Sequence, residues 1–148
     1  MAQFVTFRVA HHDYGLPIEH VQSIEPVLPI TPLPGAAPFV LGLIHLRGSV
    51  LPVLDLRRFL GLPAADWTEE TRLVVVQWAD VQAALVVDSV HDVADVADED
   101  IQAAPDVVGP LQAEQVAGVT LTDRGMLVLP RLERLFDPEL AVVAEHEA

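Results

Sequence analysis

The chain lacks cysteine altogether, and it lacks lysine as well. Without cysteine it can form no disulfide, thiol nucleophile or thiolate metal site. All eight of its basic side chains are arginines, against 22 carboxylates, so the formal net charge is −14 over 148 residues. Such an acidic chain has no basic surface for a phosphate backbone, which argues against a nucleic-acid-binding protein.

Long apolar runs are also missing. The longest are Val74–Val76, Ala83–Val87 and Met126–Leu129. These have the length of strands, whereas a helix needs about 20 apolar residues to span a bilayer. No export signal with an apolar core and a cleavage site follows Met1. We therefore expect a cytoplasmic protein.

The carboxylates are spread unevenly along the chain. Residues 1–62 hold four arginines and four carboxylates, whereas residues 72–137 hold four arginines and twelve carboxylates. Burying an unpaired carboxylate against a partner costs free energy. We therefore expect the near-neutral first half to face protein partners.

The segment from Gly42 to Leu62 combines two apolar strands, a tight turn and a short helix. Gly48 can adopt the positive φ that a tight reversal needs. Pro52 has no N–H to donate to a ladder, which places it at a sheet edge or a bulge. The apolar residues between Leu56 and Leu60 fall at helical spacing. The segment therefore predicts a hairpin with Arg47 exposed at its tip.

The order of elements in residues 1–62 recurs in residues 72–137, at an offset of about 70 residues. Each half has a first strand, a second strand followed by an acidic residue, a proline-containing loop, a hairpin and a short amphipathic helix. The corresponding segments are Phe4–Val9 and Leu73–Trp78, Gly15–Val21 and Ala84–Val90, the hairpins from Gly42 and Gly118, and the helices Leu56–Leu60 and Leu132–Phe136.

Each repeat supplies about five short strands with closely spaced turn signals, which favours a small antiparallel barrel over a βαβ sheet. We therefore predict an all-β fold of two small five-stranded antiparallel β-barrels side by side. Together they form one domain, residues 1–137, with residues 63–71 as the joint and residues 138–148 as an acidic tail. Adjacent repeats can exchange a hairpin, so sequence order leaves open which barrel each strand joins.

The sequence predicts no cofactor and no metal site. The acidic run from Asp92 to Asp100 lacks the alternating oxygen ligands and central glycine of an EF-hand. His11 and His12 are adjacent at a predicted strand turn, where their side chains diverge. The chain has no P-loop and no Gly-x-Gly-x-x-Gly element for a nucleotide phosphate.

Asp88-Ser89 is the candidate for catalytic chemistry. It follows an apolar run, as does the Asp-Thr/Ser-Gly loop of aspartic proteases, in which two carboxylates share a proton. However, Val90 occupies the glycine position, and the equivalent Glu19 does not lie in a second such loop. We therefore expect no catalytic residue and no enzyme. An aspartic-protease-like hydrolase using Asp88 stays a remote alternative.

The residues from Gly42 to Leu56 resemble the G-x-x-x-L-R-G-x-x-x-P-x-x-D-L signature of the CheW family of chemotaxis coupling proteins. Other landmarks similar to those of the family cover nearly the whole chain in the same order. They are Tyr14-Gly15-Leu16, Val21 to Ile24, Val86 to Val90, Ile101 to Pro105 and Gly118 to Leu129.

The resemblance implies paired SH3-like barrels and a non-catalytic scaffold. Members of the family bridge the cytoplasmic tips of methyl-accepting chemoreceptors to a CheA-type histidine kinase. The receptor tip docks between the barrels, and the kinase's own CheW-like regulatory domain meets one barrel end to end. The chain would join membrane receptor arrays through these partners, without inserting into the membrane. An adaptor of a pilus-motility or other non-flagellar chemosensory pathway is the alternative.

Arg47 falls on the signature arginine, which in the family supports both coupling and the local fold. Family members often place a glutamate at the position of Ser23, where it can hold this arginine. Glu25, two residues on, lies on the same face of an extended strand and can replace it. A histidine at position 45 would make binding pH-sensitive. The resemblance implies protein-binding roles for Val21, Ile24, Glu25, Leu43, His45, Arg47, Gly48 and Val87.

Overall fold

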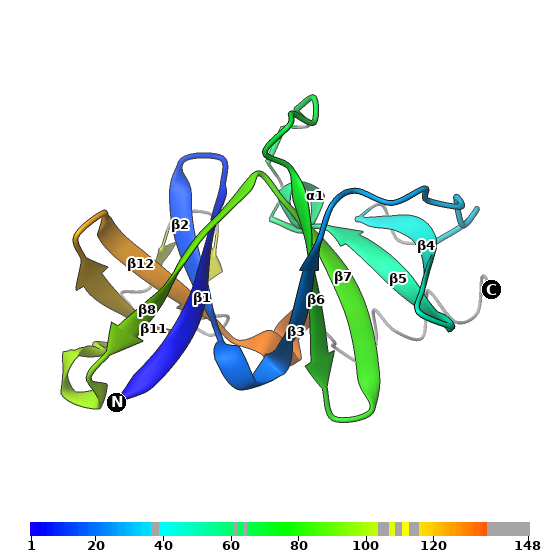
Figure 1. Cartoon of the computed structure of the whole chain (residues 1–148). Helices are drawn as coiled ribbons and strands as arrows, with labels where there is room; N and C mark the ends of the chain where they lie inside the picture. Colours follow the sequence, from blue (N-terminus) through cyan, green and yellow to red (C-terminus); the bar gives the residue numbers. More distant parts are fainter. Residues whose placement is uncertain are drawn as a thin grey trace.

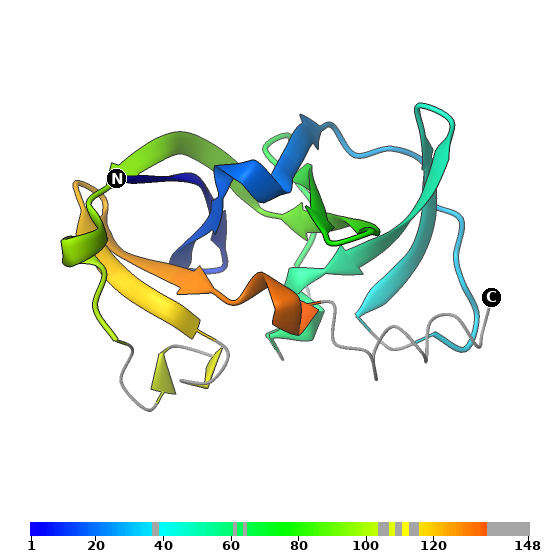
Figure 2. The same ribbon diagram turned by 90° about the horizontal axis from the view of Figure 1, so that it is seen from below.

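The computed structural model describes residues 1–36, 39–60, 62–63, 65–103, 107–108, 111–112 and 116–135. The expected acidic tail at 138–148 and the predicted domain end at residue 137 lie outside the described residues. Two five-stranded sheets dominate the structure, and each curls into a small barrel (Figures 1 and 2). We call them barrel 1 and barrel 2.

Barrel 1 has the strand order β11-β12-β2-β1-β8. Its strands are β1 (Ala2–Val9), β2 (His12–Pro17), β8 (Ser89–Val96), β11 (Val116–Thr122) and β12 (Gly125–Pro130). Barrel 2 has the order β3-β6-β7-β5-β4. Its strands are β3 (Val21–Glu25), β4 (Val40–Leu46), β5 (Ser49–Asp55), β6 (Arg72–Trp78) and β7 (Val81–Val87).

Short elements complete the described part of the chain. They are the 3-10 turns η1 (Ile18–His20) and η2 (Asp98–Asp100), the two-residue strands β9 (Val107–Val108) and β10 (Leu111–Gln112), and the helices α1 (Leu56–Phe59) and α2 (Leu132–Leu135). Both helices follow a hairpin, which confirms the predicted position of a short helix after each repeat. The described residues contain no helix long and apolar enough to cross a membrane.

Each barrel takes strands from both sequence repeats. Strands β1 and β2 of the first repeat pair with β8, β11 and β12 of the second, while β6 and β7 pair into the sheet of β3, β4 and β5. The all-β fold with two paired five-stranded barrels is confirmed. One feature differs from a purely antiparallel barrel, because β5 runs parallel to β7 and β12 runs parallel to β2.

Glycines at equivalent positions of the two repeats allow a loop to cross each hairpin closely. A Cβ on Gly42 would lie 2.1 Å from the backbone oxygen of Thr31, and a Cβ on Gly118 would lie 2.6 Å from Ile101. Each glycine sits at a register shift in its hairpin. Both repeats therefore share a β-bulge at this position, and the bulges bend the strands so that each sheet can curl.

The hydrophobic core has three parts because alternate residues of each strand face opposite sides. One cluster lies inside barrel 2, around Leu51, Val75 and Val86. A second lies inside barrel 1, around Phe4 and Leu127. The largest cluster lies between the barrels. It joins Phe7, Tyr14 and Leu16 of barrel 1 to Val74, Val76 and Leu85 of barrel 2. The barrels are thus packed into one body.

Candidate protein-binding site around Arg47

The β4–β5 hairpin ends in a two-residue turn of Arg47 and Gly48, since Leu46 pairs with Ser49. Both turn residues have positive φ, 48° for Arg47 and 84° for Gly48, as a type I′ turn requires. The positive φ expected at Gly48 is confirmed. For Arg47 the left-handed conformation is unfavourable by about 1 kcal/mol. The fold holds this arginine in a strained turn, which is typical of functional positions.

Arg47 forms an ion pair with Glu25, with 2.8 Å between Nη2 and Oε2. Glu25, which the sequence offered as a possible partner of this arginine, is thus its partner in the structure. The side chain of Arg47 is 67% exposed, whereas that of Glu25 is 12% exposed. A hydrogen bond from Ser23, followed by the bond from Arg47, lowers the pKa of Glu25 below its usual value. Ser23 therefore stabilises the carboxylate that pairs with Arg47.

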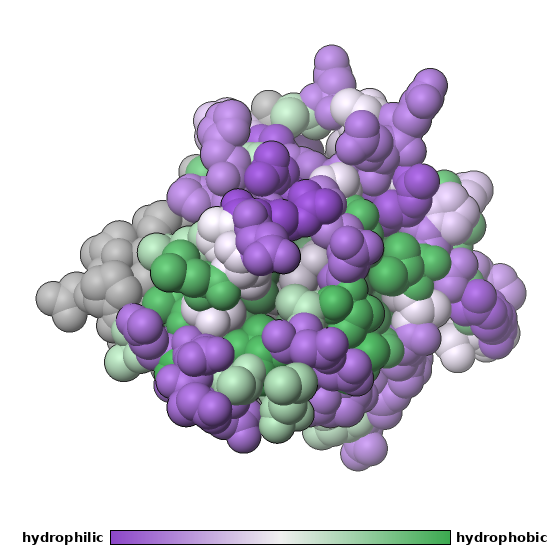
Figure 3. Space-filling view, turned by 60° about the vertical axis from the view of Figure 1, so that its left-hand side comes forward, coloured by the Kyte–Doolittle hydropathy of each residue, from purple (hydrophilic) through white to green (hydrophobic). Residues whose placement is uncertain are grey.

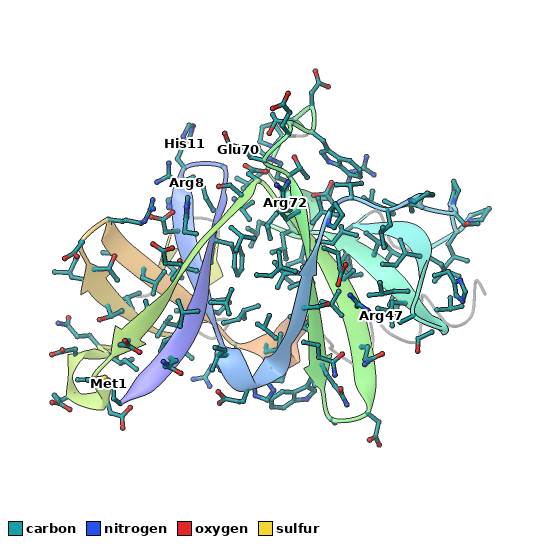
Figure 4. All side chains as sticks on the ribbon, viewed as in Figure 1. Met1, Arg8, His11, Arg47, Glu70 and Arg72 are labelled. Atoms are coloured by element: carbon teal, nitrogen blue, oxygen red, sulfur yellow. The ribbon has the colours of Figure 1, made fainter. Side chains whose placement is uncertain are left out.

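The ion pair also closes barrel 2. Strands β3 and β4 are the two edges of its sheet. Glu25 is the last residue of β3, and Arg47 lies directly after β4. The pair therefore bridges the open seam between the edges, and Figure 4 shows Arg47 on the barrel 2 side of the molecule. Because the arginine of this pair is largely exposed, the pair contributes little to stability, and we expect it mainly to fix the position of the hairpin.

The structure places the other candidate residues in different environments. Ile24 is 43% exposed, and His45 is exposed opposite Val50. Val50 is itself 62% exposed. It belongs to this surface although sequence reasoning missed it. Leu43 is half-buried, and its backbone pairs with Thr31.

Two candidates face the core. Val21 is partly buried and packs against the cluster between the barrels. Val87 is fully buried in the same cluster, so its side chain is not on the surface. Val87 is removed from the candidate binding surface. The reason is its position in β7, where it shares the face of Leu85 and points toward the other barrel.

A cavity of about 160 Å³ opens beside Arg47. It lies between the edge strand β3, the turn of the β4–β5 hairpin and the ends of β6 and β7. Its lining consists of Gln22, Ser23, Leu46, Arg47, Ser49, Leu51, Val75 and Gln82. The two glutamines were not among the sequence candidates. For Gln82 the available signal was the alternation along β7, where it shares the inward face of Ala84 and Val86.

Comparison with known proteins decides the family. The family model of the CheW-like domain matches residues 3–139. The chain belongs to the CheW family. It is 35% identical over 137 residues to the chemotaxis protein CheW of Rhizobium meliloti, covering 93% of this chain and 88% of that protein. It is 37% identical over 117 residues to protein FrzA of Myxococcus xanthus, covering 79% of this chain and 72% of FrzA.

A solved structure agrees with this assignment. The crystal structure of the scaffolding protein TtCheW from Thermoanaerobacter tengcongensis superimposes with a TM-score of 0.85 at 31% identity. The match covers 92% of this chain and 88% of that one. As a member of the CheW family, the chain is a scaffold that acts in chemosensory signalling.

In this CheW-family chain, Asp88 is a structural residue. It is the single residue between β7 of barrel 2 and β8 of barrel 1. Arg57 donates to both its oxygens, from Nε at 3.1 Å and from Nη2 at 2.6 Å. The Ala10 amide donates to Oδ2 at 2.7 Å. Asp88 thus ties α1 to the β1–β2 turn, an arrangement unlike the two carboxylates of an aspartic protease that share a proton.

Proposed function

We propose that the chain is a cytoplasmic, non-catalytic adaptor that couples the tips of methyl-accepting chemoreceptors to a CheA-type histidine kinase. Membership of the CheW family over residues 3–139 is the observation that supports this most strongly. The two partners would occupy different surfaces, the receptor tip between the barrels and the regulatory domain of the kinase at a barrel end. The chain would reach the membrane through its partners.

Exposed apolar side chains on a highly acidic chain support a protein-binding role. Ile24 and Val50 flank the Arg47 turn and are 43% and 62% exposed. Leu121 and Met126 face each other across the β11–β12 hairpin and are 77% and 54% exposed. Figure 3 shows apolar residues among hydrophilic ones on the barrel 1 side. Such residues on a soluble domain mark contact surfaces when they gather near one another.

We propose that Arg47, Ile24, Glu25, Leu43, His45 and Gly48 belong to a contact surface on barrel 2. Arg47 and Glu25 supply a fixed ion pair at its centre, and Gly48 supplies the turn that presents it. Val21 would support the surface from beneath, because it is partly buried.

Co-sedimentation with receptor-bearing membranes and a CheA-type kinase tests the proposal. The chain should pellet with membranes that contain receptor and kinase, and stay in the supernatant with membranes that lack them. Arg47→Asp should weaken this association while circular dichroism shows a folded chain. Arg131→Asp is the matched control, since Arg131 is a half-exposed arginine next to α2 with an acid 3.9 Å away. Failure of the wild-type chain to pellet with several receptors would rule out the adaptor role.

The alternative is an adaptor of a pilus-motility or other non-flagellar chemosensory pathway. The match to FrzA fits this alternative, whereas the matches to proteins named CheW favour the first candidate. Genes for a receptor, a histidine kinase and a response regulator beside the gene of this chain would identify the pathway.

A further inference from the structure

The mouth of barrel 2 is lined by a row of side-chain amides. Gln77 of β6 and Gln82 of β7 are directly paired in the sheet register. They continue the inward-facing rows that contain Val75 and Ala84. Gln22 of the edge strand β3 completes the row. Beneath it, buried Leu51 and Val75 form an apolar floor.

The amides bond to one another in one direction. Gln82 Nε2 donates to Gln22 Oε1 at 2.6 Å, and Gln22 Nε2 donates to Gln77 Oε1. Gln77 Nε2 ends the row by donating to the carbonyl oxygen of Ala79 at 2.9 Å. In the described part of the chain, no hydrogen bond occupies Gln82 Oε1. The row therefore presents an acceptor at the cavity, which Gln82 lines and Gln77 does not.

Arg47 lines the same cavity. Its Nη2 atom is paired with Glu25. A guanidinium has five N–H donors, and with 67% of its side chain exposed Arg47 can offer others to a partner. The lining of the cavity thus combines the donors of Arg47, the acceptor of Gln82 and the apolar side chains of Leu51 and Val75.

The mouth of barrel 1 has the same construction with different chemistry. There the strand pair equivalent to Gln77 and Gln82 is Arg8 and Asp13, joined by an ion pair of 3.0 Å. The charged residues that line the cavity of about 180 Å³ at this mouth are three carboxylates, those of Asp13, Asp92 and Asp123, and one arginine, Arg124. The β1–β2 and β6–β7 turns point to opposite ends of the molecule (Figure 1), so the two mouths face apart. One mouth is acidic, and the other is neutral and amide-lined.

We infer that the mouth of barrel 2 is a subsite for a primary carboxamide, the side chain of an asparagine or glutamine on a protein partner. This inference rests on the proposed adaptor function. A carboxamide has an oxygen to accept from Arg47, an NH₂ group to donate to Gln82 Oε1, and a methylene stem to lie on Leu51 and Val75. Because a carboxamide is uncharged, it adds no net charge to a site in which the charges of Arg47 and Glu25 already cancel.

Other side chains fit the cavity less well. A carboxylate has no donor for Gln82 Oε1, and it would compete with Glu25 for Arg47. A lysine or arginine would face Arg47 with like charge, and the acidic mouth of barrel 1 offers it a better environment. An apolar side chain would leave Gln82 Oε1 and the remaining Arg47 donors unpaired in the contact, which costs free energy.

Gln82→Met and Gln77→Met form a matched pair for testing the subsite. Both remove one amide from the same row at nearly constant volume, but only Gln82 lines the cavity. Binding of each variant to a CheA-type kinase regulatory domain and to a receptor cytoplasmic fragment is measured by calorimetry, with thermal unfolding in parallel. Gln82→Met should weaken binding to one partner about tenfold, the loss expected for one hydrogen bond to an unpaired group. Gln77→Met should leave both affinities within about twofold.

Three results would overturn the inference. If Gln82→Met and Gln77→Met bind like wild type while wild type binds its partners, the amide row only caps the barrel, and the adaptor function stands. If both variants lose binding in proportion to their loss of stability, the row acts through the fold alone. If Gln82→Glu tightens binding, the occupant is cationic. Absence of wild-type binding to both partners would instead contradict the proposed function itself.

Discussion

Removal of the Asp88 carboxylate should loosen the junction between the barrels. The Asp88→Ala change deletes two hydrogen bonds from Arg57 and one from the Ala10 amide, at 2.6 to 3.1 Å. Charge-assisted hydrogen bonds contribute about 1.5–3 kcal/mol each. The side chains of Asp88 and Arg57 are 33% and 21% exposed, so hydrogen bonds to water offset part of the lost free energy. Arg57 also keeps its bond to the Pro63 carbonyl at 3.3 Å. We expect a total loss of about 2 kcal/mol.

Thermal unfolding measures this loss. For a chain of this size, 1 kcal/mol lowers Tm by about 2–4 °C, so Asp88→Ala should lower Tm by about 4–8 °C. Glu133→Ala is the control, because its pair with Arg131 is 3.9 Å long with both side chains nearly half exposed. It should cost less than about 1 kcal/mol. In a double-mutant cycle, Arg57→Ala should add little to Asp88→Ala. Equal Tm values for Asp88→Ala and Glu133→Ala would refute the junction role.

Three further predictions follow from the structure. Gly42→Ala should lower the free energy of unfolding, measured by urea titration, by at least about 2 kcal/mol, because its Cβ would clash with a backbone oxygen. Gly48→Ala should lower it by only about 1 kcal/mol through backbone strain. Equal losses for the two variants would contradict the close contact at Gly42. Burial raises the pKa of Tyr14 to about 12, so unfolded chains ionise first and stability should fall as pH rises from about 10 to 12. As the chain has one tyrosine, the ultraviolet absorbance of its phenolate reports that pKa alone, and a midpoint near the usual value of about 10 would show that the ring is solvated. Charge reversal at Asp95 and Asp98 should leave kinase coupling unchanged. Loss of coupling in this variant would show that the acidic repeat also faces a partner.

Sequence patterns predicted the parts of the fold that depend on periodicity and on glycine. The alternating strands around Arg47-Gly48 and the recurrence of the pattern in the second half specified two barrels with a short helix after each hairpin. The exchange of strands between barrels could not be fixed this way, because it depends on how the largest cluster is buried between the sheets. That burial is a property of two repeats together.

Two positions differ from the sequence-based prediction, each for an identifiable physical reason. The predicted turn at His11 and His12 lies one residue earlier, at Ala10-His11, since Val9 pairs with His12. Ala10 adopts a φ of 57°, which an alanine in the sequence does not signal. Val87 was assigned to a binding surface although it is fully buried, because an apolar strand residue looks the same whether it faces a partner or the other barrel.

The candidate site was predicted in part. The Arg47 turn and its partner Glu25 were recognised because a signature motif and the two-residue period of a strand place them. The amide row was missed, since Gln22, Gln77 and Gln82 are far apart in the sequence and a glutamine at a strand end usually faces solvent. Only the curling of the sheet brings the three side chains into one row.

Receptor-controlled kinase activity tests the central claim most directly. The autophosphorylation rate of a CheA-type kinase is measured with receptor-bearing membranes, with and without the chain, and with receptor ligand added. We predict that the rate responds to receptor ligand only when the wild-type chain is present, and that Arg47→Asp weakens the response while Arg131→Asp does not. An equal response with and without the chain, for several receptors, would contradict the assignment of this protein as the coupling scaffold.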